Sequence, residues 1–194
     1  MATDSKFDLC SAALVAIGAH RIATFEDGTA EATVAGSLYE MLVDHELGRH
    51  RWNFAKRVFK LNRLAEVPLH RWAYLYQLPA DCILLRSVYF SGQPVAYEQY
   101  DGRRVASDAL DPIAEFTGRI AEDQWPAYFM ALMRMRLEAH FLGALMKDPA
   151  QKERMLAEQD SPPRGFYHKA RTLDAQEQPP SKFPKGALFS ARGR

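Results

Sequence analysis

Two stripes of apolar residues recur at helical spacing near the start of the chain. The first consists of Phe7, Cys10, Leu14 and Ile17, and the second of Val34, Leu38, Met41 and Leu42. Gly18 follows the first stripe where a left-handed helix cap is expected, so the pattern predicts a helix over residues 4–17. Asp27-Gly28 marks a turn before the second stripe, which predicts a helix from about Thr29 to Leu47.

The pattern changes to one typical of strands after Pro68. Aromatic residues crowd Trp72–Tyr76, and Cys82–Phe90 is a β-prone run. The turn signals Ser91-Gly92 and Asp101-Gly102 follow, and the second is a strong hairpin signal. We therefore expect a small antiparallel β subdomain inserted between helices.

Helical periodicity then returns. The segment from Trp125 to Met146 is apolar on most faces and predicts a central core helix. Charged and polar side chains interrupt it at Arg134, Arg136, Glu138 and His140, which excludes a membrane span. Asp148-Pro149 is typical of a helix start, Ser161-Pro162-Pro163 breaks that helix, and residues 166–176 favour one more. Gln178-Pro179-Pro180 ends the regular structure.

These elements predict an α+β fold: mainly an α-helical bundle with an inserted small antiparallel β subdomain and an extended C-terminal arm. The expected organisation is a bundle of residues 1–67 and 119–177, a β subdomain of residues 68–118 and an arm of residues 178–194. A chain of 194 residues can bury one good core with a subdomain attached to it.

Composition is that of an ordinary globular protein, with 47% hydrophobic and 25% charged residues. Cys10 and Cys82 lie far apart in the sequence and are expected to be free core thiols. Residues 1–6 show no secretory signal, so we expect folding in a cytoplasm. The net charge is +1, but residues 161–194 carry seven basic and two acidic side chains, which leaves the preceding part about −4.

Candidate catalytic and metal-binding groups are few. His45 and His50 resemble a zinc-protease helix, but they are five residues apart and not four, so they do not share a helix face. Asp108 and Asp111 could serve as acid and base, although aspartate beside Pro112 favours a turn. We expect no catalytic residue, no cofactor and no metal, and a small soluble enzyme that uses the two aspartates remains an alternative.

A second alternative is a regulatory protein that binds nucleic acid. This alternative depends on a basic cluster that is interleaved with the aromatic residues Trp52, Phe54 and Phe59. The cluster consists of Arg49, His50, Arg51, Lys56, Arg57, Lys60 and Arg63. The favoured interpretation packs the aromatic side chains inward and leaves the charges on a solvated face. A ring whose lumen passes DNA would also need basic residues without a base-reading motif.

Several sequence blocks resemble a known family. Ile17-Gly18 and Glu31-Ala32 are followed by Trp52-Asn53-Phe54-Ala55, and then by a Tyr-x-Leu-Pro-x-Asp-Cys block at Tyr76–Cys82 and a Leu-rich helix. In this order and spacing, over residues 9–147, they resemble head-to-tail adaptors of tailed bacteriophages, of the tail tubular protein A type. The family-motif core is then Trp52, Phe54, Tyr76, Leu78, Pro79 and Asp81. Residues 161–165 depart from the family, because they interrupt what is usually one long closing helix.

The resemblance implies a structural virion protein and not an enzyme. Such adaptors form a ring, usually dodecameric, between the portal and the tail or nozzle. The implied partners are copies of the chain itself, the portal protein, a tail or nozzle protein and genomic DNA that passes through the lumen without sequence specificity; no membrane is implied. The implied location is the head–tail interface of the virion, after assembly in the host cytoplasm.

The last 17 residues, 178–194, are basic, broken by prolines and without a periodic apolar face. The resemblance implies an arm that inserts along the portal, and a merely solvated terminus is the alternative. The residues expected to bind the portal are Lys182, Phe183, Lys185, Leu188, Phe189, Arg192 and Arg194.

Overall fold

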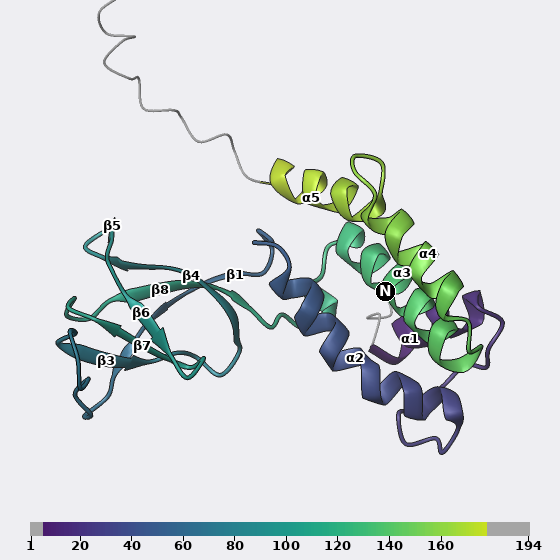
Figure 1. The fold of residues 1–194 in the computed structure, drawn as a ribbon, viewed down its shortest axis with the longest axis horizontal. Helices are drawn as coiled ribbons and strands as arrows, with labels where there is room; N and C mark the ends of the chain where they lie inside the picture. The colour runs from purple at the N-terminus through teal and green to yellow at the C-terminus, as the bar shows by residue number, and fades with distance from the viewer. Residues whose placement is uncertain (1–5, 178–194) are drawn as a thin grey trace, which may run out of the picture.

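The computed structural model describes residues 6–177 and confirms the α+β class. Its helices are α1 (Lys6–Ala16), α2 (Ala30–Gly48), the 3-10 turn η1 (Glu122–Gln124), α3 (Ala127–Leu145), α4 (Pro149–Asp160) and α5 (Phe166–Gln176). They lie together at one end of an elongated molecule, and the strands lie at the other (Figure 1). The predicted arm, residues 178–194, lies outside the described residues.

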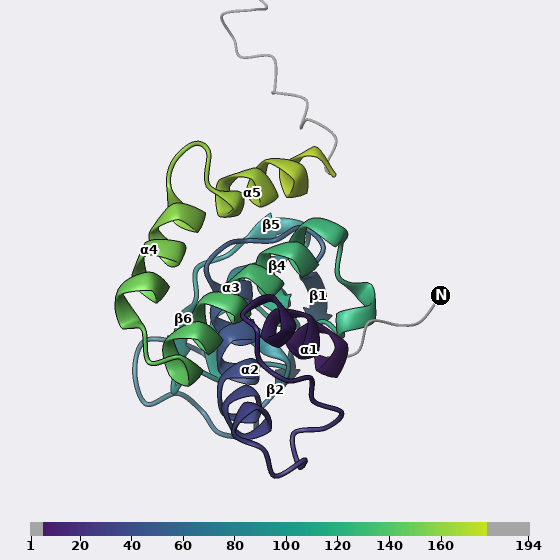
Figure 2. The same cartoon turned by 90° about the vertical axis from the view of Figure 1, so that its right-hand side faces the viewer.

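The helical end is built around α3. This helix contacts α1, α2, α4 and α5, and in the end-on view α1 and α2 lie on one side of it and α4 and α5 on the other (Figure 2). Its buried side chains include Phe129, Leu132, Leu137 and Phe141, as expected of a helix that is apolar on most faces. The prediction of a central core helix is confirmed, with bounds a residue or two inside those expected.

Helix ends follow the chemistry of their capping residues. The Thr29 side chain accepts a hydrogen bond from the Ala32 N–H at the start of α2, and Asp148 accepts one from Gln151 N–H before Pro149 opens α4. Both starts were predicted. The helix predicted over residues 4–17 is described from Lys6 to Ala16, and residues 4 and 5 lie outside the described residues.

The strands form two antiparallel sheets. Sheet A has the order β1-β8-β4-β5 and sheet B the order β2-β3-β7-β6. Their bounds are β1 (Lys56–Lys60), β2 (Asn62–Arg63), β3 (Tyr74–Gln77), β4 (Cys82–Phe90), β5 (Gln93–Pro94), β6 (Glu98–Tyr100), β7 (Arg104–Ser107) and β8 (Ile113–Gly118). Together they make a β unit with its own apolar cluster, which includes Tyr76, Leu85, Val88 and Phe116.

The two predicted turns close hairpins. Ser91-Gly92 joins β4 to β5 and Asp101-Gly102 lies between β6 and β7, and all four residues have positive φ. Two consecutive residues of positive φ suit the twist of paired strands, which is why Asp-Gly and Ser-Gly are informative there.

The β unit begins earlier than predicted. Residues 56–67 were assigned to the helical bundle, but β1 and β2 belong to the two sheets. All five residues of β1 are exposed, and β1 is an edge strand. Lysine and arginine are common on edge strands, where they discourage pairing with other chains. The charged sequence Lys56–Lys60 is therefore compatible with a strand, although it lacks the pattern from which strands are usually predicted.

Candidate functional site

The junction between the helical end and the β unit is centred on Trp52, which is fully buried. Its indole N–H donates to the Glu46 carbonyl at 2.8 Å, and its rings lie 5.0 Å from His50 and 5.2 Å from Phe129. Phe54 is half-buried and packs on the same core, with its ring 4.8 Å from Phe129. Trp52 is therefore a core residue, as predicted, and Phe54 packs against the same core.

Arg86 of β4 ties this core to sheet A. Its Nε donates to the Thr117 hydroxyl at 3.0 Å, and its terminal nitrogen donates to the Trp52 carbonyl. Only 7% of Arg86 is exposed, and burial lowers its pKa. Sequence reasoning missed Arg86, although a cation within the apolar strand run Cys82–Phe90 is a signal of a buried partner.

The second family block lies where β3 leads into β4. Tyr76 is buried and its hydroxyl donates to the Ala109 carbonyl at 2.6 Å, and Leu78 is buried as well. Pro79 accepts a hydrogen bond from the Cys82 N–H and so closes a turn. Asp81, at the end of this turn, forms an ion pair with Arg57.

Both family blocks meet at one step of the backbone. Ala55 accepts the Gly118 N–H and Asp81 accepts the Arg119 N–H, each at 2.9 Å, at the point where β8 ends. A side chain at Gly118 would place its Cβ 2.5 Å from Cδ of Arg57, so glycine leaves room for the Arg57–Asp81 pair. The two blocks thus fix where the chain leaves the β unit for the helices.

Asp174 fastens α5 to the same junction. This carboxylate is 1% exposed and accepts the Asn53 N–H at 2.8 and 3.0 Å and the Tyr128 hydroxyl at 2.9 Å. His50 Nε2 lies 3.9 Å away, although burial lowers the pKa of that imidazole. Burial and the hydrogen bond to Asp174 raise the pKa of Tyr128.

A buried ionic cluster holds α4 against α2 and α3. Arg136 of α3 is 2% exposed; its Nε lies 3.1 Å from Glu46 Oε1, and its terminal nitrogens reach Gln159 and Asp160. Arg49 bridges the same two carboxylates, at 3.1 Å from each. Although burial raises the pKa of Asp160, the hydrogen bonds from the two arginines outweigh it and lower that pKa.

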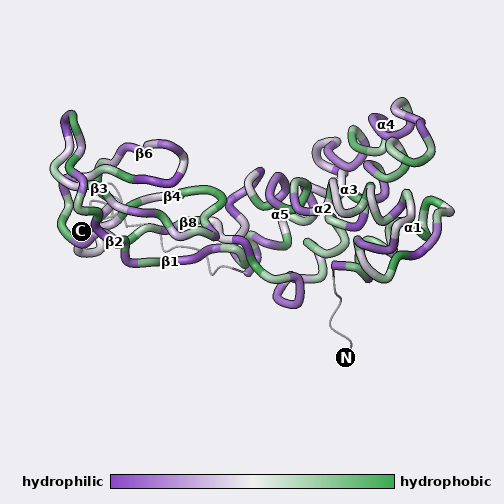
Figure 3. Tube along the Cα trace, turned by 90° about the horizontal axis from the view of Figure 1, so that it is seen from below, coloured by the Kyte–Doolittle hydropathy of each residue, from purple (hydrophilic) through white to green (hydrophobic). Residues whose placement is uncertain are grey.

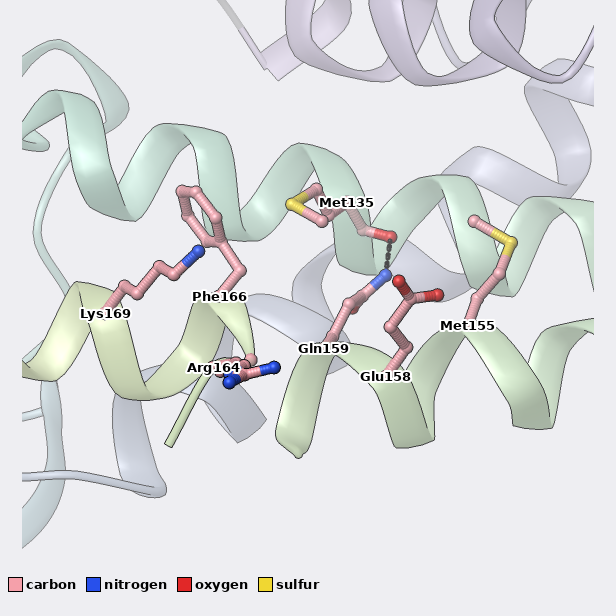
Figure 4. A pocket seen from close by; sticks show the side chains of 8 residues that line it. Met135, Met155, Glu158, Gln159, Arg164, Phe166 and Lys169 are labelled. Atoms are coloured by element: carbon pink, nitrogen blue, oxygen red, sulfur yellow. Dashed lines mark hydrogen bonds between the residues drawn. The ribbon is translucent and has the colours of Figure 1, made fainter. Parts of the chain in front are cut away.

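A cavity of about 270 Å³ lies between α3, α4 and the start of α5 (Figure 4). Met135, Met155 and Phe166 supply apolar walls, and Arg164 and Lys169 supply positive charge. The Gln159 amide donates a hydrogen bond to the Met135 carbonyl at 2.9 Å and so links α4 to α3 beside the cavity.

The two aspartates considered for catalysis have partners within the chain, and the two cysteines are buried or half-buried. Asp108 accepts the Ala73 N–H at 2.9 Å, and Asp111, at a φ of 57°, lies 3.2 Å from Lys60. Burial raises the pKa of the Cys10 thiol to about 12 and that of the half-buried Cys82 to about 11. Within residues 6–177, no cluster of His, Cys, Asp or Glu is placed to hold a metal ion.

The basic cluster is largely neutralised by acids of the same chain. Lys56 pairs with Glu115 at 3.6 Å, Arg57 with Asp81, and Lys60 with Asp111. Arg49 belongs to the ionic cluster, and the Arg63 guanidinium lies 4.2 Å from the Tyr74 ring. Acids of the same chain thus partly offset four of these cations, Arg49, Lys56, Arg57 and Lys60, which reduces the positive charge free to neutralise phosphates.

Exposed apolar side chains concentrate on the β unit. Among the described residues they include Val58, Phe59, Val67, Leu69, Phe90, Leu110 and Ile113. Exposed apolar side chains that lie close together mark interaction sites. The seven residues predicted for the portal-binding arm, from Lys182 to Arg194, lie outside the described residues.

Neither a scan against protein-family models nor a search of curated proteins finds a match to this chain. In the described part of the chain, none of the helices has both the length and the apolar character to cross a bilayer.

Proposed function

We propose that the chain is a structural subunit of a bacteriophage head-to-tail adaptor, assembled as a ring, usually dodecameric in such adaptors, between the portal and the tail or nozzle. The observation that carries this proposal is the meeting of the two family blocks at Gly118-Arg119. Ala55 belongs to the first block and Asp81 to the second, and they bind consecutive N–H groups of one chain crossing. The residues on which the resemblance depends thus lie together where the helical unit joins the β unit.

The exposed surface favours a role in assembly over a role in catalysis. Val58 is 62% exposed and Leu69 fully exposed, so the β unit offers apolar area to a partner. A closed ring needs two different contact surfaces on each subunit, and the helical end and the β unit differ in shape and secondary structure (Figure 1). In this proposal DNA passes through the lumen without specific contacts, and the arm of residues 178–194 attaches to the portal.

Binding to a portal protein of the phage or prophage from which the chain comes tests the proposal. We expect purified chain and portal rings to form a complex at micromolar concentration, seen by co-sedimentation and as an added ring in electron micrographs. Removal of residues 178–194 should weaken or abolish this attachment while the melting temperature stays nearly unchanged. Replacement of exposed Leu173 of α5 by serine is the matched control and should bind normally. Absence of binding by the full chain would remove the adaptor assignment, and normal binding by the truncated chain would remove the role of the arm.

A further inference from the structure

The cavity between α3, α4 and the start of α5 has apolar walls and a charged rim, and we call it the α5 cavity. Arg164 and Lys169 lie with Phe166 at the α5 end of the rim, and Glu158 lies toward the α4 end (Figure 4). Among residues 6–177, neither Arg164 nor Lys169 has an acid as an ion-pair partner. With Glu158 included, the rim carries a net charge of +1, and its α5 end is basic.

The size of the α5 cavity suits side chains of a protein partner. Its volume of about 270 Å³ is below the range of about 300–1,000 Å³ that is typical of small-molecule sites. Two of its walls are Met135 and Met155, and flexible methionine side chains adapt to the shape of an inserted apolar group. A fitting partner therefore presents an apolar side chain together with negative charge.

Helix α2 presents such a combination on its exposed face. Met41 is 57% exposed, and the side chains of Glu40 and Asp44 are each 58% exposed. At 3.6 residues per turn, these three positions lie within about 100° of the helix circumference. They form one apolar projection flanked by two carboxylates, which we call the α2 knob.

The α2 knob keeps an excess of negative charge. Glu40, Asp44 and Glu122 share a single arginine, Arg119, whose nitrogens lie 2.9, 3.7 and 3.0 Å from their carboxylates. Three carboxylates and one guanidinium have a net charge of −2. The knob is therefore complementary in charge to the basic end of the α5 cavity.

The two surfaces lie on different sides of the helical end. Helices α2 and α5 are on opposite sides of α3 (Figure 2), and both belong to the helical end, away from the β unit (Figures 1 and 3). The knob faces away from α3 because its side chains are exposed. A contact between such surfaces places successive copies side by side, which is the heterologous arrangement that a closed ring needs.

We propose that copies of the chain associate head to tail, with the α2 knob of one subunit seated in the α5 cavity of the next. Met41 inserts between the apolar walls, and Glu40 and Asp44 face Arg164 and Lys169. The complementary charges orient the contact and select this pairing over knob against knob or cavity against cavity. The inference rests on the ring assembly proposed above and names the contact between neighbouring subunits.

The test measures self-association of the full chain by sedimentation velocity, up to millimolar concentration and without portal protein. In Met41→Lys, the knob would bring an ammonium group into an apolar cavity beside two cations. In the double variant Arg164→Glu, Lys169→Glu, the rim of the cavity would repel the acidic knob. Each variant should self-associate about tenfold or more weakly than the wild type.

A mixture of the two variants gives the decisive measurement. The Met41→Lys chain keeps an intact cavity and the double variant keeps an intact knob, so the mixture should form heterodimers with close to wild-type affinity. The matched control is Arg51→Glu with Arg103→Glu, which makes the same change in charge at two exposed arginines outside both surfaces. This control should associate like the wild type, and equal melting temperatures of all variants show that the effects do not come from unfolding.

Three outcomes would overturn the proposal: a wild-type chain that stays monomeric over the whole concentration range, variants that associate as the wild type does, or a mixture that associates no better than its components. The portal-binding experiment is independent of this one. A chain that binds the portal but fails here keeps the adaptor assignment and loses this contact. Restored association in the mixture without portal binding would have the opposite meaning.

Discussion

Arg86 and Trp52 form a direct bridge between sheet A and the helical end: the guanidinium of the first donates to the backbone carbonyl of the second, 34 residues away. The remaining Arg86 contact, to Thr117, lies within the sheet. A single buried cation thereby fixes the position of the aromatic core relative to the strands.

Replacement of Arg86 by methionine should test this bridge. Methionine keeps much of the apolar stem but leaves the Trp52 carbonyl and the Thr117 hydroxyl without their donor, which typically costs about 1–3 kcal/mol. We expect a matching loss in the free energy of unfolding measured with urea. Arg103→Met, at an exposed arginine, is the control and should stay within about 0.5 kcal/mol of wild type. A stability of Arg86→Met equal to that of the control would contradict the bridge.

Truncation of Trp52 to alanine should destabilise the chain by about 3–5 kcal/mol, because it empties the centre of a packed aromatic cluster. The protein should then unfold at markedly lower temperature or aggregate on expression. Met41→Ala, at a residue 57% exposed on α2, is the matched control and should have little effect. A soluble Trp52→Ala protein with an unchanged melting temperature would show that the cluster does not stabilise the fold.

The ionic cluster predicts non-additive mutations. Arg136→Met removes one of the two arginines that pair with the buried Glu46, and breaking a buried pair in this way costs about 3 kcal/mol or more. Addition of Glu46→Met removes the orphaned charge and should recover part of the loss. Urea unfolding of the two single variants and the double variant gives the coupling. Strictly additive losses would mean that the two side chains do not stabilise one another.

The pH dependence of stability should include a contribution from His140. Burial, followed by the nearby cations Lys152 and Arg136, lowers the pKa of His140 to about 4, whereas an unfolded histidine titrates near 6.5. Since the unfolded chain binds the proton first, the stabilisation is complete above pH 6.5 and is lost as the pH falls from there towards 4. His140→Gln should flatten this part of the curve of unfolding free energy against pH. A His140→Gln curve identical to that of the wild type would refute the assignment.

Local patterns predicted much of the fold. The stripe ending at Leu42 and the apolar run around Leu137 give helices, and Asp101-Gly102 gives a hairpin, because each signal is contained within a few residues of sequence. The strand β1 was missed because an edge strand needs no buried side chain, so Lys56–Lys60 lacks the alternation that strands usually show.

The candidate site was predicted only in part. Trp52 and Tyr76 could be identified from their size and from the family blocks. Asp174 could not, because its partner Asn53 is 121 residues away and no local pattern relates the two. Arg136 was noticed only as an interruption of an apolar helix; a charge in that position is itself the signal of a buried acid on another helix.

The separation of the two apolar cores has a mechanical consequence. One core belongs to the helices and another to the β unit, and the strands β1, β4 and β8 run between the two ends along the long axis of the molecule (Figure 1). Tension applied between the two ends would therefore act along these strands. It would load all the hydrogen bonds of a strand pair together (shear), whereas a pull perpendicular to the strands would break them one after another (unzipping). The Gly118-Arg119 crossing, held by Ala55 and Asp81, is the point through which such a force would pass.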